Sequence, residues 1–209
     1  SWAGTVTFGI YFLFQATIGK KLLQDCGGFS SAAAASCTLM MIAVNMTGVG
    51  CCGFLSRLAG NRRKPFLLTG TLLVFLATGF ITLILWRRLD ARWLVPCYAM
   101  LAGAGAFTPI YCAAMKELNR PAAAGTAMGL LNGIIYLFIA VVMNVAGVVM
   151  DAFKSQAVIT PKAVVYPPAA YITILVGCFV LAAISVLAAL RIHETFGKSI
   201  YGETKIETC

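Results

Sequence analysis

Six long apolar stretches constrain the fold of this chain more than any other feature. They run over Trp2–Ile18, Ala32–Leu55, Pro65–Trp86, Leu94–Met115, Ala122–Met150 and Ala169–Leu190. A helix that spans a membrane needs about 20 residues, and only 11% of this chain is charged, against about 25% in soluble domains. The stretches are continuous rather than alternating, which excludes a β-barrel. The sequence therefore predicts an all-α membrane protein with six transmembrane helices.

The basic residues indicate how the helices are threaded. If the first residue is cytoplasmic, the loops and tail of that side hold nine of the 16 lysines and arginines, and the other side holds seven. Loops that face the cytoplasm are the richer in basic residues. We therefore expect one six-helix domain over residues 1–209, with a cytoplasmic tail at 193–209. Because the first stretch begins at residue 2, we also expect the chain to be part of a longer protein.

The third and sixth stretches carry fewer strong polar groups than the others. The polar side chains of the third are threonines, and the sixth holds Thr173 and Ser185 besides Cys178. Hydroxyl groups can bond to the preceding turn of their own helix, so such helices tolerate lipid. The recurrence indicates two three-helix repeats, at 1–92 and 93–192, inverted in the membrane plane as in many secondary transporters. We expect the third and sixth helices on the outside.

Polar residues share one face of the first stretch. Thr7, Tyr11 and Gln15 recur every fourth residue, which places them on one side of a helix. An amide that faced lipid would leave its hydrogen-bonding groups unsatisfied, so we expect this face to line a substrate cavity, with bonding between helices as the alternative. Further candidates for the same cavity, each with packing as an equal alternative, are Thr38, Asn45, Tyr111, Asn132 and Tyr136.

Three glycines of the fifth stretch are spaced four residues apart. Gly125, Gly129 and Gly133 therefore fall on one face of a helix. Small residues at this spacing let two helix backbones approach closely. We interpret them as a helix-packing surface rather than as substrate contacts.

The middle of each stretch lacks a titratable group that could carry protons. The seven acids lie in loops, near span ends or in the tail, at Asp25, Asp90, Glu117, Asp151, Glu194, Glu203 and Glu207. A proton-coupled carrier needs a titratable group inside the membrane, so we expect any coupling residue to lie outside this chain. No serine, histidine or acid is placed to activate a nucleophile, and we expect no enzymatic activity.

The residue pattern also disfavours cofactors and nucleic acid. The eight cysteines are scattered without metal-ligand spacing, and the one histidine is His193, so we expect no metal site and no cofactor. The net charge of +9 resides in short loops and the tail, where it favours lipid headgroups over nucleic acid. The partner that the composition predicts is the lipid bilayer.

A basic loop at residues 53–64 separates the second and third stretches. It resembles the loop signature of the major facilitator superfamily, which reads glycine, three residues, an acid, a basic residue, any residue, glycine, any residue and two basic residues. The residues that match are Gly53, Gly60, Arg62 and Arg63. Arg57 stands in place of the signature's acid, which braces the loop against a neighbouring helix in that family. Leu58 replaces the basic residue that follows.

The resemblance extends over nearly the whole chain and is to the C-terminal six-helix half of a prokaryotic major facilitator transporter. Besides the loop, it is carried by residues 11–15 leading to 27–30, and by residues 116–121 with 125–127 and Asn132. It implies a secondary active transporter, symporter or antiporter, that moves a small polar metabolite by alternating access in the bacterial inner membrane. The first and fourth helices of the half would line the cavity.

The same resemblance implies that this half does not transport alone. Its partners would be the missing N-terminal six-helix half and a small-molecule substrate such as an amino acid, a nucleoside or an organic acid. A second hypothesis is a complete six-helix protein that acts as a membrane scaffold, a channel or a homodimeric carrier. Six further helices encoded upstream would distinguish the two.

Overall fold

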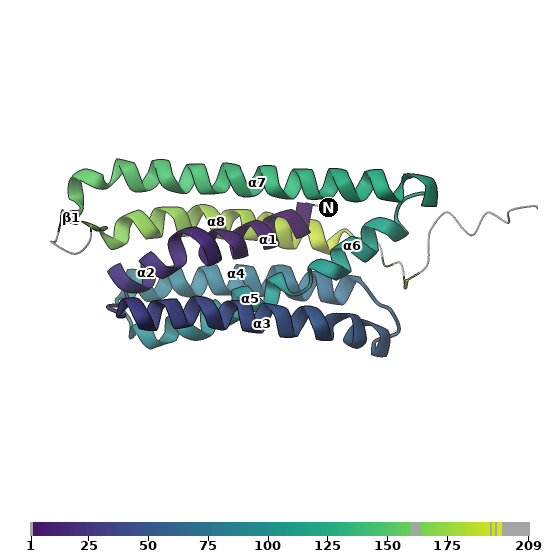
Figure 1. Cartoon of the computed structure of the whole chain (residues 1–209), viewed down its shortest axis with the longest axis horizontal. Helices are drawn as coiled ribbons and strands as arrows, with labels where there is room; N and C mark the ends of the chain where they lie inside the picture. Colours follow the sequence, from purple (N-terminus) through teal and green to yellow (C-terminus); the bar gives the residue numbers. More distant parts are fainter. Residues whose placement is uncertain (1, 160–163, 193, 195, 198–209) are drawn as a thin grey trace, which may run out of the picture.

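Long helices packed side by side make up this protein (Figure 1). The computed structural model describes residues 2–159, 164–192, 194, 196 and 197, and most of the predicted tail at 193–209 lies outside them. Four helices are unbroken, namely α3 (Ser31–Leu58), α4 (Lys64–Arg87), α7 (Ala124–Ala152) and α8 (Pro168–Leu190). Their ends lie within about three residues of the predicted spans, because hydropathy alone marks where such helices start and stop.

The first span is longer than predicted and is interrupted. α1 (Trp2–Leu13) passes into a π-helical turn, η1 (Phe14–Ile18), and continues as α2 (Gly19–Asp25). The sequence predicts an end at Ile18, because polar residues follow. Two of those residues, Lys21 and Asp25, instead form an ion pair of 2.7 Å one helical turn apart, which stabilises the continued helix.

The fourth span is divided into two shorter helices. A 3-10 turn, η2 (Ala91–Trp93), leads into α5 (Leu94–Gly105), and α6 (Thr108–Glu117) follows after a break of two residues. A further turn, η3 (Pro121–Ala123), precedes α7. The helix is thus completely interrupted just before Pro109.

The described helices identify an integral membrane protein. Five helical stretches in the described part of the chain are long and apolar enough to cross a membrane, corresponding to α3, α4, the fourth span, α7 and α8. The interrupted run from α1 to α2 adds a sixth helical segment. The prediction of a helical membrane protein from the apolar stretches is therefore confirmed at this level.

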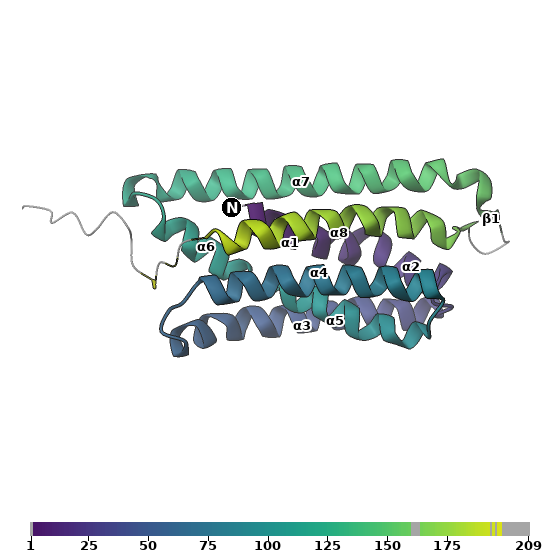
Figure 2. The same cartoon turned by 180° about the vertical axis from the view of Figure 1, so that it is seen from behind.

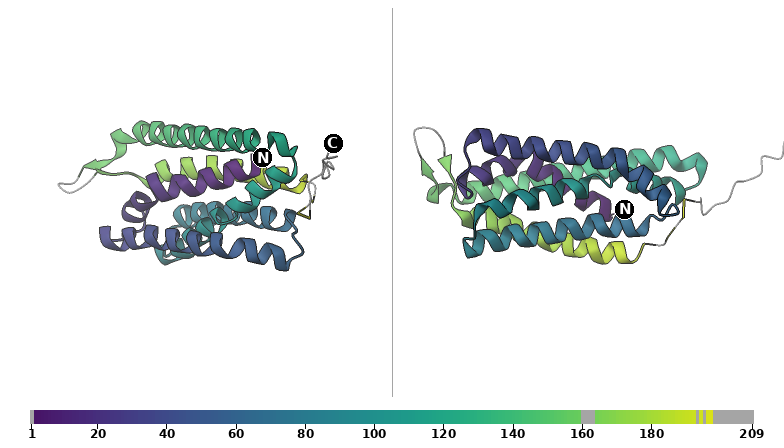
Figure 3. Two further views of the ribbon diagram at one scale, coloured as in Figure 1. Left: turned by 45° about the vertical axis from the view of Figure 1, so that its right-hand side comes forward. Right: turned by 90° about the horizontal axis from the view of Figure 1, so that it is seen from below.

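A small hairpin corrects the all-α prediction. After η4 (Lys154–Gln156), the strands β1 (Val158–Ile159) and β2 (Val164–Val165) pair antiparallel, with Val158 opposite Val165. The hairpin projects past the helix ends (Figure 3). Strands of two residues are too short for an alternating pattern to be read from sequence.

The helices form three layers, which the right-hand view of Figure 3 shows. α4 and α8 pack along each other as one outer layer, α1 and α5 lie in the middle, and α3 and α7 lie on the opposite side. α1 packs against α7 and α8, whereas α5 packs against α3 and α4. Seen from behind, α4 and α8 stand in front of the middle layer (Figure 2). The third and sixth helices therefore share one side of the bundle, and their position on the outside of the protein stays a prediction.

The outward face of the α4–α8 layer is mostly apolar. Its large exposed side chains are Leu72, Leu76, Phe80 and Leu83 on α4 and Val176, Val180, Ile184 and Leu187 on α8. Thr69 and Thr173 are also exposed, and their hydroxyls donate to carbonyls of their own helices at 2.8 and 2.9 Å. The α4 threonines Thr71 and Thr78 are buried, and the Thr78 hydroxyl donates to the Val74 carbonyl at 2.8 Å. Since no strong polar group is left unsatisfied there, this face is suited to lipid.

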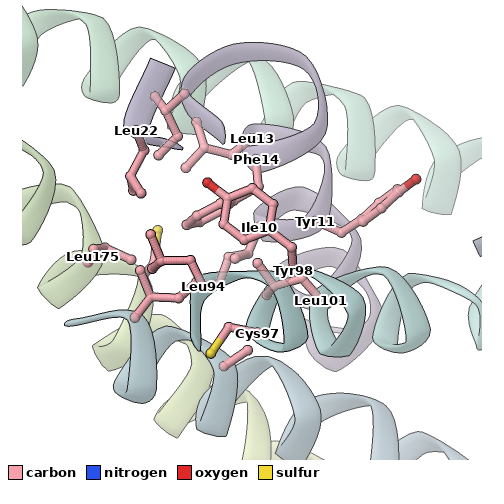
Figure 4. Close-up of a cluster of buried hydrophobic side chains, with 14 of the residues drawn as sticks. Ile10, Tyr11, Leu13, Phe14, Leu22, Leu94, Cys97, Tyr98, Leu101 and Leu175 are labelled. Atoms are coloured by element: carbon pink, nitrogen blue, oxygen red, sulfur yellow. The ribbon is translucent and has the colours of Figure 1, made fainter. Parts of the chain in front are cut away.

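An aromatic pair lies at the centre of the core, between the first and fourth spans (Figure 4). The rings of Phe14 and Tyr98 meet edge to face, with centroids 5.5 Å apart. Tyr98 is fully buried and its hydroxyl donates to the Gly19 carbonyl at 2.8 Å. An added Cβ at Gly19 would lie 2.1 Å from the Phe14 carbonyl oxygen of the π turn and 3.2 Å from the Tyr98 ring, so this position requires a residue without a side chain.

Asp25 ties together the end of the bundle that carries the hairpin. Its carboxylate accepts hydrogen bonds from Lys21 Nζ at 2.7 Å, the Tyr166 backbone N–H at 2.9 Å and the Tyr171 hydroxyl at 2.8 Å. Lys21 also donates to the Val164 carbonyl. The Asp25 side chain is only 2% exposed, so an acid that the sequence places in a loop is a buried structural anchor.

Candidate functional site

The break between α5 and α6 is produced by a proline whose missing hydrogen bond is replaced locally. Pro109 has no backbone N–H and its ring displaces the carbonyl four residues earlier, which is that of Gly105. The Thr108 hydroxyl donates to this carbonyl at 2.7 Å. The backbone can therefore leave the helical path inside the bundle without an unsatisfied carbonyl.

Three helices meet at Gly105, the last residue of α5. A Cβ at this position would lie 2.8 Å from Asn45 Nδ2 on α3 and 3.0 Å from the Tyr11 ring on α1. Asn45 donates from the same Nδ2 to the Ala102 carbonyl of α5 at 3.2 Å. The structure therefore brings together two of the predicted cavity residues, Tyr11 and Asn45, over a position where a side chain does not fit.

A groove opens beside this junction, between α1, α3, α5 and α6. Its volume is about 570 Å³, and its lining is Phe8, Asn45, Val49, Gly105, Thr108, Pro109, Cys112, Ala113 and Lys116. Small-molecule sites have volumes of about 300–1,000 Å³ with a mostly apolar lining and a few polar groups. The groove therefore has the size and the composition of such a site, and we take it as the candidate functional site.

The π turn that follows α1 holds an amide whose oxygen is unpaired among the described residues. Gln15 lies within η1, and its side-chain Oε1 is buried without a hydrogen-bond partner among the described residues. π turns occur frequently at functional sites, and an unsatisfied buried acceptor is costly. Gln15 is not among the residues that line the groove, so its assignment to the substrate cavity stays a prediction.

Thr7 and Tyr111 lie in the interior rather than on an open face. Both are at most 3% exposed; the Thr7 hydroxyl donates to the Ala3 carbonyl at 2.8 Å and the Tyr111 hydroxyl to the Leu67 carbonyl at 3.3 Å. Thr38 donates to the Ala35 carbonyl of its own helix at 2.8 Å. These hydrogen bonds within the protein fit a packing role, which was the alternative to substrate binding. None of the three residues lines the groove.

α7 presents three different faces around its axis. One packs on the bundle and buries Leu131, Ile135 and Ile139, each at most 5% exposed. The second is exposed and apolar, with Leu130, Ile134, Leu137, Val141, Val145 and Val148. The third, which we call the polar face of α7, is exposed and consists of Gly125, Gly129, Asn132, Gly133, Tyr136 and Asn144. The predicted cavity residues and the predicted packing glycines of the fifth span thus share one face.

The glycines of the polar face touch no other helix of this chain. A Cβ added at Gly125, Gly129 or Gly133 would meet no atom of the described residues within 4 Å. The close packing that their spacing predicts is therefore absent within the chain as described. It stays a prediction about a partner helix outside it.

The basic loop adopts a left-handed turn that explains one of its glycines. Gly60 and Asn61 have φ angles of 70° and 56°, a region that glycine and asparagine enter most readily. Arg57 and Arg62 are exposed, and Gly53 lies on the exposed surface of α3. The signature residues Gly53, Arg57 and Arg62 thus have no structural role that the described contacts reveal.

Arg63 is the residue that braces the loop. Its guanidinium donates to Glu117 at the end of α6, at 2.7 and 3.1 Å, and to the Ser56 hydroxyl of α3 at 2.7 Å. The backbone N–H groups of Arg63 and Lys64 donate to the Glu194 carboxylate at 2.5 and 3.0 Å. Glu194 thereby caps the N-terminus of α4. Bracing therefore does not depend on the signature's acid, which Arg57 replaces.

Sequence reasoning missed the partners in these polar clusters. Glu117 and Glu194 lie 54 and 131 residues from Arg63, and Asp25 meets Tyr171 from 146 residues away. The sequence shows that acids and basic residues occur near the span ends, but it does not indicate which acid pairs with which basic residue of the loop at 53–64. Lys116 was assigned only to a loop, and its place in the groove follows from the division of the fourth span.

Comparison with known proteins adds no relatives. Neither a family model, nor a curated protein, nor a solved structure matches this chain. Among the described residues, no group of histidine, cysteine, aspartate or glutamate side chains could hold a metal ion. The site's chemistry is therefore argued from its own side chains.

Proposed function

We propose that this chain is one six-helix half of a secondary transporter of the major facilitator type, which moves a small organic molecule across a membrane by alternating access. The observation that carries the proposal is the exposed polar face of α7, beside a bundle whose opposite layer is mostly apolar on its outside. The groove between α1, α3 and α6 would be this half's contribution to the substrate site.

The polar face of α7 requires a cover that lipid does not provide. The side chain of Asn132 would leave its amide unsatisfied in hydrocarbon, where no water is present. Gly125, Gly129 and Gly133 let another backbone approach this face closely. Both properties fit a second protein unit, and the partner we propose is the other six-helix half.

The pairing of the helices supports two three-helix repeats at 1–92 and 93–192. Two repeats would make the first span equivalent to the fourth, the second to the fifth and the third to the sixth. The α1–α7 contact is then equivalent to the α5–α3 contact, and both pairs of helices are packed. The α4–α8 contact, between the third and sixth spans, is equivalent to itself. This pattern is the one expected for inverted repeats in secondary transporters.

Two of the three spans that line the groove, the first and the fourth, are the interrupted ones, whereas α3 is continuous. α1 continues through the π turn η1, and the α5–α6 segment breaks between Gly105 and Thr108. Discontinuous helices commonly form the binding site of secondary transporters, where irregular backbone lines a cavity. The interruptions supply points at which the groove could change shape as the transporter rocks between its two open states.

Counterflow in liposomes tests the proposal. The full gene product that contains this chain is reconstituted and its exchange of labelled amino acids, nucleosides and organic acids is compared with that of residues 1–209 alone. We expect exchange by the full product and none by the chain alone. Exchange by the chain alone would favour a homodimeric carrier, and exchange by neither, with both folded, would reject transport of these classes.

A further inference from the structure

We propose that the groove between α1, α3 and α6 binds an organic anion with an apolar body, whose acid group lies at Lys116. The inference rests on the proposed function for the role of the groove, and it narrows the substrate class from polar metabolites in general to organic acids. It follows from three properties of the groove, namely its lining, its charge and its length.

The lining of the groove is apolar with one cation. Phe8, Val49 and Pro109 contribute apolar surface, and Asn45 contributes an amide. Among the described residues of the lining, Lys116 alone carries a charge, and none is an acid. A neutral sugar or nucleoside would find few hydrogen-bonding partners here, whereas an amphipathic acid matches both the surface and the charge.

Among the described residues, no carboxylate forms an ion pair with the ammonium group of Lys116. Glu117, the adjacent acid, is directed to Arg63 with contacts of 2.7 and 3.1 Å. Lys116 is exposed and also lines the groove, so its ammonium group is accessible to an anion whose apolar body contacts the rest of the lining.

The length of the groove fits a ligand of medium size. Thr108 and Lys116 both line it from α6 and lie eight residues apart in the sequence, which is about 12 Å along a helix. A carboxylate at Lys116 would therefore direct a medium-length alkyl or aryl chain toward Phe8 and the junction at Gly105. An inorganic anion would leave most of this apolar surface unoccupied.

Cys112 is a natural reporter of occupancy, because it also lines the groove, one helical turn before Lys116. The purified chain in detergent is treated with N-ethylmaleimide, and the modification of each cysteine is followed by mass spectrometry. Cys51, which is exposed on α3 and is not part of the lining, is the internal control. The probes are hexanoate and hexanamide, which have nearly the same shape and differ in charge.

We expect hexanoate, and not hexanamide, to slow the labelling of Cys112. At ten times its Kd a ligand leaves about a tenth of the sites free, so labelling should slow about tenfold. Labelling of Cys51 should be unchanged. Lys116→Gln should abolish the protection of Cys112, and Lys116→Arg should retain it. Lys20→Gln, a control at an exposed position of α2, should leave the protection unchanged.

Three results would overturn the inference. They are equal protection by the acid and the amide, protection that survives Lys116→Gln, and a Cys112 that is never labelled, which would mean that protein or lipid fills the groove. If Lys116→Gln does not fold, the acid–amide comparison on the natural chain and on Lys116→Arg still decides. If the full gene product transports but hexanoate does not compete, the anion site is rejected and the transporter function is retained. If hexanoate protects Cys112 but the full gene product does not transport, the anion site is retained and the transporter function is rejected.

Discussion

Gly105 shows how a single missing side chain sets the geometry of the groove. Asn45 and Tyr11 approach it from two other helices to distances of 2.8 and 3.0 Å from the position of a Cβ. The Asn45 hydrogen bond to the Ala102 carbonyl depends on that approach. This part of the groove wall therefore requires a glycine, and the requirement follows from the packing of the three helices rather than from the local sequence.

Gly105→Val should destabilise the protein and close the groove. The added side chain must displace the Asn45 amide or the Tyr11 ring, and overpacking of this kind costs about 1–3 kcal/mol. The matched control is Gly50→Val on α3, where an added Cβ meets no described atom within 4 Å. We expect a loss of several degrees in the thermal stability of the detergent-solubilised protein for Gly105→Val only. Equal stability of the two variants would contradict the three-helix contact.

Arg63 should contribute more to the stability of the folded protein than Arg62. Arg63→Gln removes the donors to Glu117 and Ser56, in a cluster whose paired side chains are only 15% and 12% exposed. Hydrogen bonds to charged groups contribute about 1.5–3 kcal/mol, so a clear fall in thermal stability is expected. Arg62→Gln, with the same loss of charge on an exposed side chain, should change stability by less than about 0.5 kcal/mol. The reverse order would show that net charge, and not bracing, stabilises the loop.

Among the elements, α7 is the one whose sequence pattern is explained least by its own chain. Its buried and apolar faces are those of any helix at the edge of a membrane bundle. Its polar face combines Asn132 and Tyr136 with glycines that touch nothing within 4 Å. This is the face that we propose the second six-helix half to cover.

Gly129→Ile should leave the isolated chain intact but impair the assembled protein. A Cβ added at Gly129 meets no described atom within 4 Å and the position is exposed, so the chain alone should keep its thermal stability to within about 0.5 kcal/mol. It would block the close approach of a partner helix, and exchange by the full gene product should fall. Gly177→Ile on α8, which is equally exposed and equally free of contacts, is the control. Loss of exchange in both variants would indicate a general defect rather than an interface at α7.

The span boundaries could be predicted from sequence, whereas the contacts between spans could not. Hydropathy defines where α4 and α8 begin and end, and Pro109 indicates the break in the fourth span. The π turn at Phe14–Ile18 has no known local signal, and it changes which residues share a face with Tyr11. Thr7 and Tyr11 both lie in the regular helix α1, but the periodicity that grouped Gln15 with them assumed that this helix continues beyond Leu13, where the π turn begins.

The candidate site was predicted only in part, and for a physical reason. Asn45 was identified because an amide inside a membrane needs a partner, and it does lie at the groove. Lys116 was missed because a cation near a span end normally marks the interface with water. Its position becomes meaningful only once α6 is seen to start again after the break and to present Cys112 and Lys116 along one side.

The whole molecule is asymmetric in the surfaces that it offers to its surroundings. The α4–α8 layer exposes apolar side chains such as Leu76, Phe80 and Val180, and the hydroxyls of its exposed threonines, Thr69 and Thr173, bond within their own helices. The α3–α7 layer differs in that it also exposes side-chain amides, on α7. A protein surrounded by lipid on all sides has no reason for this difference, whereas one half of a two-half transporter needs a lipid side and a partner side.

Photolabelling from the lipid phase would test this asymmetry. A phospholipid with a diazirine in its acyl chain is activated in liposomes that hold the chain alone or the full gene product, and the modified residues are mapped by mass spectrometry. Because lipid reaches every exposed surface of a solitary bundle, both layers should be labelled in the chain alone. In the full product, α4 and α8 should keep their labelling, while residues of the polar face of α7 such as Tyr136 should lose most of theirs. Equal labelling of Tyr136 in the two samples would mean that no second half covers this face, and protection of Phe80 instead would place the partner on the opposite layer; either result would refute the proposed arrangement.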